Sequence, residues 1–130
     1  MIAVDSSVLL RYLLQDDADQ GRAAAEFFET KLSSNLPGFI SAVVLLEMIW
    51  VARRAYKLSA EAVADTVGEL LDSPNLVVEH SPVIRAALST GPDHLADTLV
   101  HELGRRAGCS ETVTFDRRFA RLPGVRLLGG

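Results

Sequence analysis

The sequence predicts an α/β fold in which parallel strands form a sheet covered by helices on both faces. Short apolar runs alternate along the chain with longer segments of helical periodicity, and this alternation is typical of parallel strands joined by helices. The runs are continuous rather than alternating in polarity, which indicates strands buried on both faces. With 130 residues, the chain is expected to be a single domain covering residues 1–130.

The expected strands are short apolar runs bounded by turn or capping residues. They span residues 2–4, 39–40, 76–78, 112–114 and 125–128. The expected helices lie between them, over residues 6–14, 16–32, 41–56, 59–71, 81–88 and 93–107. Ser6 or Ser7, Ser41 and Ser59 are the expected N-caps, because a hydroxyl can accept from a free amide of the first turn. Gly108 is expected to end the last helix.

Four carboxylates stand at or beside these apolar runs, namely Asp5, Glu47, Asp97 and Asp116. Asp5 and Asp116 follow strands, whereas Glu47 and Asp97 lie early in helices. Ligands of parallel sheets bind at the carboxyl ends of the strands, so we expect the four acids to converge there. Isolated buried carboxylates are costly unless they are paired or bind a metal. Ligands that are all oxygen suit Mg²⁺ or Mn²⁺, which also bind phosphate, and this points to phosphodiester chemistry.

Each carboxylate also has a purely structural interpretation. Asp5 can be an N-cap, Asp97 an acid that favours the helix dipole, and Asp116 a turn residue. Glu47 is harder to explain in this way, because apolar side chains flank it on both sides. We therefore expect Glu47 to be buried with a partner.

Composition narrows the class of protein. The net charge of −4 is accounted for by the four carboxylates alone, and arginines cluster after three of them. These clusters can be solvated helix faces or phosphate contacts. The single cysteine, Cys109, cannot form an internal disulfide. The N-terminus lacks the pattern of a signal peptide, and the longest apolar stretch is far shorter than the roughly 20 residues that span a bilayer. A cytoplasmic protein without a membrane partner is expected.

Histidines and aromatic residues allow further interpretations. His94, Asp97 and His101 have helical spacing, which would suit a transition-metal site, although two partly exposed histidines beside an acid are the commoner arrangement. Trp50 and Tyr56 are interpreted as aromatic residues of the core or of a dimer interface rather than as platforms for bases.

The order of the acidic motifs resembles that of the PIN domain, and within it the VapC-type ribonuclease toxins of toxin–antitoxin pairs. MIAVDSSVLLRYLLQDD is similar to the opening of the family and places its first acid at Asp5. ISAVVLLEMIWV carries the second at Glu47, LADTLVHELGRRAGC the third at Asp97, and TVTFDRRF the fourth at Asp116, beside Thr114. The resemblance covers nearly the whole chain.

This resemblance implies a three-layer α/β/α sandwich with a central parallel sheet of about four to five strands. It implies an endoribonuclease in which the four acids hold Mg²⁺ or Mn²⁺, with Ser6 and Thr114 orienting carboxylates. It further implies an RNA substrate, a cognate antitoxin and a homodimer. Many relatives have an acid three residues before the third carboxylate. This chain has His94 there and Asp93 one position earlier, which leaves open whether Asp93 has a supporting role.

Two other functions fit an acidic α/β chain. A phospho-acceptor domain also binds Mg²⁺ at strand ends, but it needs a lysine near the last strand, and the only lysines are Lys31 and Lys57. A catalytically silent PIN-like module would act by binding protein alone. Retention of all four acids argues against that module.

Overall fold

The computed structural model describes residues 1–129, and within them it confirms the predicted α/β class. The chain divides into two compact units, Met1–Ser81 and Pro82–Gly130. All strand pairs are parallel, as predicted. The strands form two separate ladders, one of three strands and one of two, rather than the one sheet that the sequence suggested. No helix in the described part of the chain is long and apolar enough to cross a bilayer.

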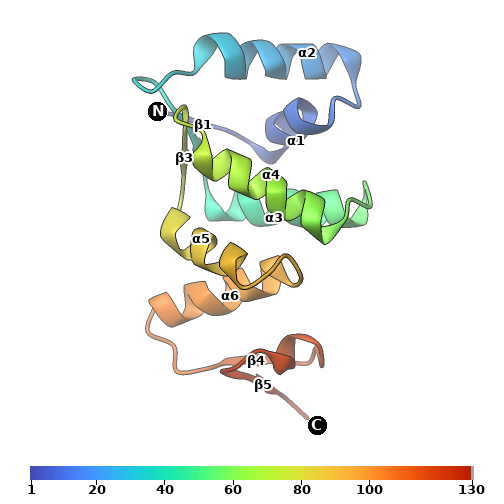
Figure 1. The fold of residues 1–130 in the computed structure, drawn as a ribbon, viewed down its shortest axis with the longest axis vertical. Helices are drawn as coiled ribbons and strands as arrows, with labels where there is room; N and C mark the ends of the chain where they lie inside the picture. The colour runs from blue at the N-terminus through green and yellow to red at the C-terminus, as the bar shows by residue number, and fades with distance from the viewer. Residues whose placement is uncertain (130) are drawn as a thin grey trace. The chain divides into compact units, whose positions relative to one another are not determined.

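The first unit is built on the three-stranded sheet (Figure 1). Its elements in chain order are β1 (Ile2–Ala3), α1 (Ser6–Leu14), α2 (Ala18–Glu26), a π-helical turn (Phe27–Lys31), β2 (Gly38–Ile40), α3 (Ala42–Arg54), α4 (Ala60–Asp72) and β3 (Leu76–Val78). The strand order is β1-β2-β3, so β2 is central. Helix α1 packs against α2 and α3, and α4 packs against α3 and β3.

The middle of the sheet needs a glycine for steric reasons. A Cβ added to Gly38 would lie 2.9 Å from Leu32 Cδ1, 3.1 Å from Leu76 Cδ2 and 3.2 Å from Val4 Cγ2. Gly38 pairs with Ile2 on one side and with Leu76 on the other. Three apolar side chains therefore close over the backbone of β2 at this point, and β2 leads from there to α3.

Helix starts follow the predicted capping chemistry with one change. Ser41 accepts from the amide of Val44 at 3.2 Å, and Ser59 accepts from that of Ala62 at 3.0 Å, as expected. At α1 the cap is Asp5, not Ser6 or Ser7. The segment 16–32 is also not one regular helix: it begins after the cap Asp17 and widens into the π-helical turn at Phe27.

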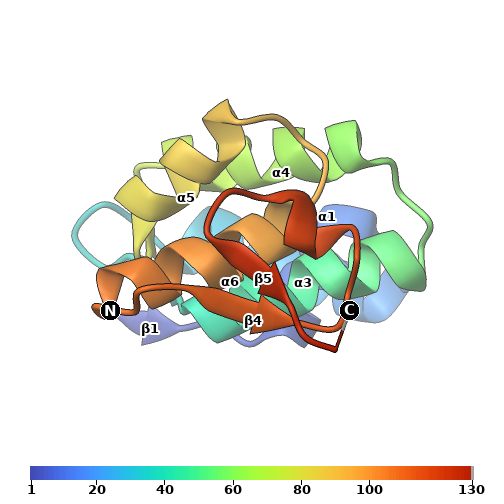
Figure 2. The ribbon, with the colours of Figure 1, turned by 90° about the horizontal axis from the view of Figure 1, so that it is seen from below.

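The second unit carries the two-stranded sheet, whose strands lie side by side in Figure 2. Helix α5 (Ser81–Ser89) leads into this unit, which continues with α6 (Leu95–Arg106), β4 (Thr112–Thr114), a 3₁₀ turn (Phe119–Arg121) and β5 (Val125–Leu127). Helix α6 starts two residues later than predicted, because His94 has a left-handed backbone (φ 62°). Ile84 and Leu99 are buried, 2% exposed each.

Candidate active site

Asp5 lies where β1 ends and α1 begins. Its carboxylate accepts from the Ser7 hydroxyl at 2.7 Å and from the Ser7 amide at 3.3 Å, so it caps α1. These hydrogen bonds, with the hydroxyl contributing most, hold the pKa of Asp5 below its usual 3.8. Asp5 is exposed. It is therefore an ionised, accessible carboxylate with its orientation fixed by its own helix turn.

Glu47 lies on the second turn of α3 and is held by Ser6. The Ser6 hydroxyl, which is 9% exposed, donates a hydrogen bond to Glu47 Oε1. Since Ser6 follows Asp5 directly, this contact brings Glu47 to the α1 turn that presents Asp5. The contact joins residues 41 positions apart in sequence.

The prediction that Glu47 is buried is wrong, because its side chain is exposed. The buried face of α3 consists of Leu45, Met48, Ile49 and Ala52, which repeat with helical spacing. Glu47 falls between these positions in sequence but on the opposite face of the helix. The prediction of a partner was right, and that partner is Ser6.

Asp97 and Asp116 form an electrostatically coupled pair in the second unit. Asp97 lies in the first turn of α6 and is half-buried. Burial raises the pKa of Asp97 above its usual 3.8, and the negative charge of Asp116 raises it further. His94 and Arg118 act in the opposite direction. The two carboxylates therefore repel each other when both are ionised.

Asp116 is fixed by the turn that follows β4. Its Oδ1 accepts from the backbone amides of Arg118 at 2.8 Å and Phe119 at 3.3 Å. Thr114 Oγ1 accepts from the backbone amide of Asp116 at 3.0 Å. Thr114 thus shapes the turn through the backbone amide of Asp116, and whether it also orients a carboxylate stays a prediction. Asp116 itself is exposed.

The histidines do not form the transition-metal site that their spacing allowed. His94 precedes α6, so it is not on a common helix face with Asp97 and His101. His101 is only 6% exposed, not partly exposed as predicted, and its Nδ1 shares a hydrogen bond of 2.7 Å with Thr112 Oγ1. Asp93 is exposed in the loop before α6.

The donor chemistry of the predicted acids fits a hard divalent cation. All four offer carboxylate oxygens, and a cation would offset the repulsion between Asp97 and Asp116. Within residues 1–129, no group of three or more His, Cys, Asp or Glu side chains lies close enough to hold an ion. The structure brings Glu47 to the turn of Asp5, and it brings Asp97 close to Asp116. The convergence of all four stays a prediction.

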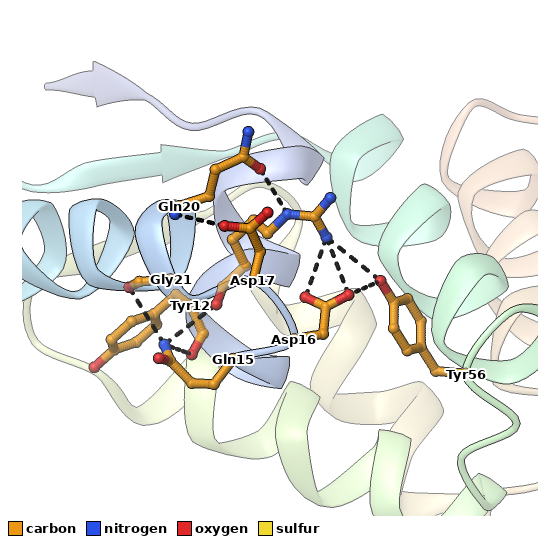
Figure 3. A network of polar contacts seen from close by, with 8 residues as sticks. Tyr12, Gln15, Asp16, Asp17, Gln20, Gly21 and Tyr56 are labelled. Atoms are coloured by element: carbon orange, nitrogen blue, oxygen red, sulfur yellow. Dashed lines mark hydrogen bonds and ion pairs between the residues drawn. The ribbon is translucent and has the colours of Figure 1, made fainter.

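In the first unit, a polar network links α1 and α2 to the segment that follows α3 (Figure 3). Arg11 Nη1 contacts Asp16 Oδ1 at 3.1 Å, and the Tyr56 hydroxyl donates to Asp16 Oδ2 at 2.5 Å. Arg11 Nε donates to Gln20 at 2.7 Å. The bond from Tyr56 contributes most to lowering the pKa of Asp16. This network was not predicted from the sequence, because no local pattern indicates a hydrogen bond between residues 40 positions apart.

The network borders a cavity of about 580 Å³ between β1, α1 and α2. Asp5 and Ser7 stand at this cavity together with Arg11 and Gln20, and most of the remaining lining is apolar. Because its hydroxyl donates to Asp16, Tyr56 belongs to this polar network rather than to an apolar core. Trp50 is not a core residue either, since it is 58% exposed.

Comparison with known proteins confirms the predicted resemblance to the PIN domain. A sequence model described as PIN domain matches residues 2–125 of the chain. The chain is also similar to a VapC ribonuclease of Aquifex aeolicus (strain VF5), with 27% identity over 125 residues. That similarity covers 94% of this chain and 92% of the relative.

Proposed function

We propose that this chain, which belongs to the PIN domain family, is a metal-dependent endoribonuclease and the toxin of a toxin–antitoxin pair. The observation that carries the proposal is the similarity, over 94% of the chain, to a protein named VapC ribonuclease. The side chains of the predicted site support it. Asp5, Glu47 and Asp116 are each held by a local turn or by Ser6, and these three side chains are exposed.

The proposed ligands of Mg²⁺ or Mn²⁺ are Asp5, Asp97, Glu47 and Asp116. Such an ion, when bound, lowers the pKa of a bound water and stabilises charge on the phosphate and on the leaving oxygen. Asp5 and Asp97 are assigned direct ligation. Glu47 is assigned contact through water or help in deprotonating the attacking water, and Asp116 a second ion or the shaping of the first site.

The remaining side chains orient these acids. Ser7 holds the Asp5 carboxylate, and Ser6 holds that of Glu47. Thr114 fixes the backbone from which Asp116 projects. Asp93, in the loop before α6, is proposed only as a supporting acid. Because the acids are ligands in this scheme, none of them becomes covalently modified.

The proposed partners are RNA, a cognate antitoxin and a second copy of the chain, all in the cytoplasm. An antitoxin with an arginine directed at the acids would compete with the cation, since guanidinium matches a carboxylate in geometry and charge. Expression of the chain alone should slow growth, and co-expression of the antitoxin should restore it. Harmless expression of an active, folded enzyme would remove the toxin assignment and leave the nuclease assignment.

Incubation of the purified chain with a mixed RNA pool and Mg²⁺ tests the enzymatic proposal. New RNA ends are expected. A parallel incubation with Mg²⁺ and acetyl phosphate, followed by intact-mass measurement, should show no added phosphoryl group. A stoichiometric adduct without RNA cleavage would indicate a phospho-acceptor, although Lys31 and Lys57 both lie outside the last strand. If neither new RNA ends nor a phosphoryl adduct forms, the result would indicate a catalytically silent binding module.

A further inference from the structure

The outer face of α3 carries an exposed tryptophan in line with a predicted catalytic acid. Exposed positions on this helix recur at helical spacing and include Val43 near its start. The α3 strip is defined here as the four exposed residues beyond it, Glu47, Trp50, Arg53 and Arg54. Trp50 is 58% exposed and Val43 is 74% exposed. Trp50 therefore lies one turn beyond Glu47, on the same face of the helix.

The end of the α3 strip is positively charged. The Arg54 guanidinium lies over the Trp50 ring, with its Cζ 5.2 Å from the ring centroid. Arg53 donates to the Leu58 carbonyl at 2.7 Å. Lys57 lies in the loop that follows α3. Within residues 1–129, none of these three cations forms an ion pair with a carboxylate. Their charge is thus available to an anionic partner.

We propose that the α3 strip binds the single-stranded RNA substrate, with a nucleobase stacked on Trp50 and the adjoining phosphates near Arg54 and Arg53. This inference rests on the proposed function. Non-specific single-strand binding combines aromatic stacking with cations that follow the backbone. At about 1.5 Å per residue, Arg54 lies roughly 10 Å along the axis from Glu47. That distance matches about three stacked nucleotides at 3.4 Å each.

A second copy of the chain is the competing occupant of the strip. An exposed tryptophan suits a dimer interface as well as a nucleobase. A copy packed along the strip would, however, cover Glu47, which the proposed chemistry requires to be open to substrate. It would also leave Arg53, Arg54 and Lys57 without the anionic partner that their charge favours. The positive charge at the end of the α3 strip therefore favours RNA over a second copy of the chain as its occupant.

The single tryptophan makes the proposal measurable, because fluorescence excited at wavelengths beyond the absorption of the two tyrosines reports on Trp50 alone. The full chain carrying Asp97→Asn, with Mg²⁺ and a short mixed-sequence single-stranded RNA, should bind without cleavage. Saturable quenching of the Trp50 fluorescence is expected. Trp50→Ala in the same background should weaken RNA binding by about 5- to 150-fold, the range of one lost stacking contact. Trp50→Phe should retain most of the affinity.

Val43→Ala is the matched control, since Val43 is exposed on the same face of α3 but lies outside the α3 strip and carries no stacking surface or charge. Its RNA affinity should equal that of the parent chain. Arg54→Gln should lower the slope of log affinity against log salt by about 1, as expected for the loss of one phosphate contact.

Three results would overturn the inference. They are unquenched Trp50 fluorescence, equal RNA affinity of Trp50→Ala and Val43→Ala, and failure of the Asp97→Asn chain to bind RNA that the wild type cleaves. If Trp50→Ala also turns a dimer into a monomer in sedimentation, the occupant is the second copy. If the wild-type chain cleaves RNA but any of these results is obtained, only the inference about the α3 strip fails and the proposed function stands. Absence of cleavage by the wild type counts against the proposed function itself.

Discussion

Removal of the Ser6 hydroxyl tests whether the contact with Glu47 serves the reaction. Ser6→Ala deletes a donor that is 9% exposed and bonded to a carboxylate. Buried hydrogen bonds to charged groups contribute about 1.5–3 kcal/mol, but water can replace the donor at the exposed Glu47. We therefore expect the free energy of unfolding to fall by about 1 kcal/mol, which lowers the Tm by roughly 3–6 °C.

Ser59→Ala is a control matched in stability. Ser59 caps α4 by accepting from the Ala62 amide, and loss of such a cap also costs about 1 kcal/mol. Both variants should unfold at similar urea concentrations. Only Ser6→Ala should cleave RNA more slowly, because only Ser6 holds one of the proposed site acids. Full activity of Ser6→Ala, or an equal loss in Ser59→Ala, would refute the assigned role of Ser6.

Three further predictions follow from the described contacts. Asp97→Asn should raise the free energy of unfolding in EDTA, because the raised pKa of Asp97 in the folded chain means that its ionisation opposes folding. The gain should be absent below about pH 3.8 and complete above the pKa of Asp97 in the folded chain. Urea unfolding at a series of pH values would measure it. The hydrogen bond from Tyr56 lowers the pKa of Asp16, and the stability that this contributes is lost as pH falls through that pKa. Tyr56→Phe should therefore unfold at a higher pH than the parent chain during acid titration. An unchanged midpoint of acid unfolding would contradict this. Gly124→Ala should lower the Tm: it places a Cβ 3.0 Å from the His101 ring at a φ of +85°, a conformation that costs an L residue about 1–2 kcal/mol. An unchanged Tm for that variant would contradict the close approach.

Local patterns in the sequence were sufficient to predict most elements of the fold. Ser41 and Ser59 begin the expected helices, and the run 76–78 is a strand, because capping and burial of short apolar runs depend on neighbouring residues. The left-handed backbone at His94 and the widening at Phe27 carry no comparable signal. The division of the strands into two ladders was not predicted either, because strand pairing joins residues far apart in sequence.

The candidate site shows the same limit. The sequence places Asp5 and Asp116 after strands, and the structure agrees. The predicted burial of Glu47 failed because apolar neighbours in sequence do not define a helix face. The bond between His101 and Thr112 and the network around Asp16 depend on contacts between different elements, which the periodicity of a single segment cannot predict.

Divalent-cation dependence of RNA cleavage tests the central claim most directly. The purified chain, free of antitoxin, should cleave a mixed RNA pool with Mg²⁺ or Mn²⁺, lose this activity in EDTA and regain it when the ion is restored. Asp5→Asn should be inactive with Mg²⁺ yet folded, because Asn caps a helix about as well as Asp. Undiminished cleavage in EDTA, or full activity of Asp5→Asn, would contradict the account.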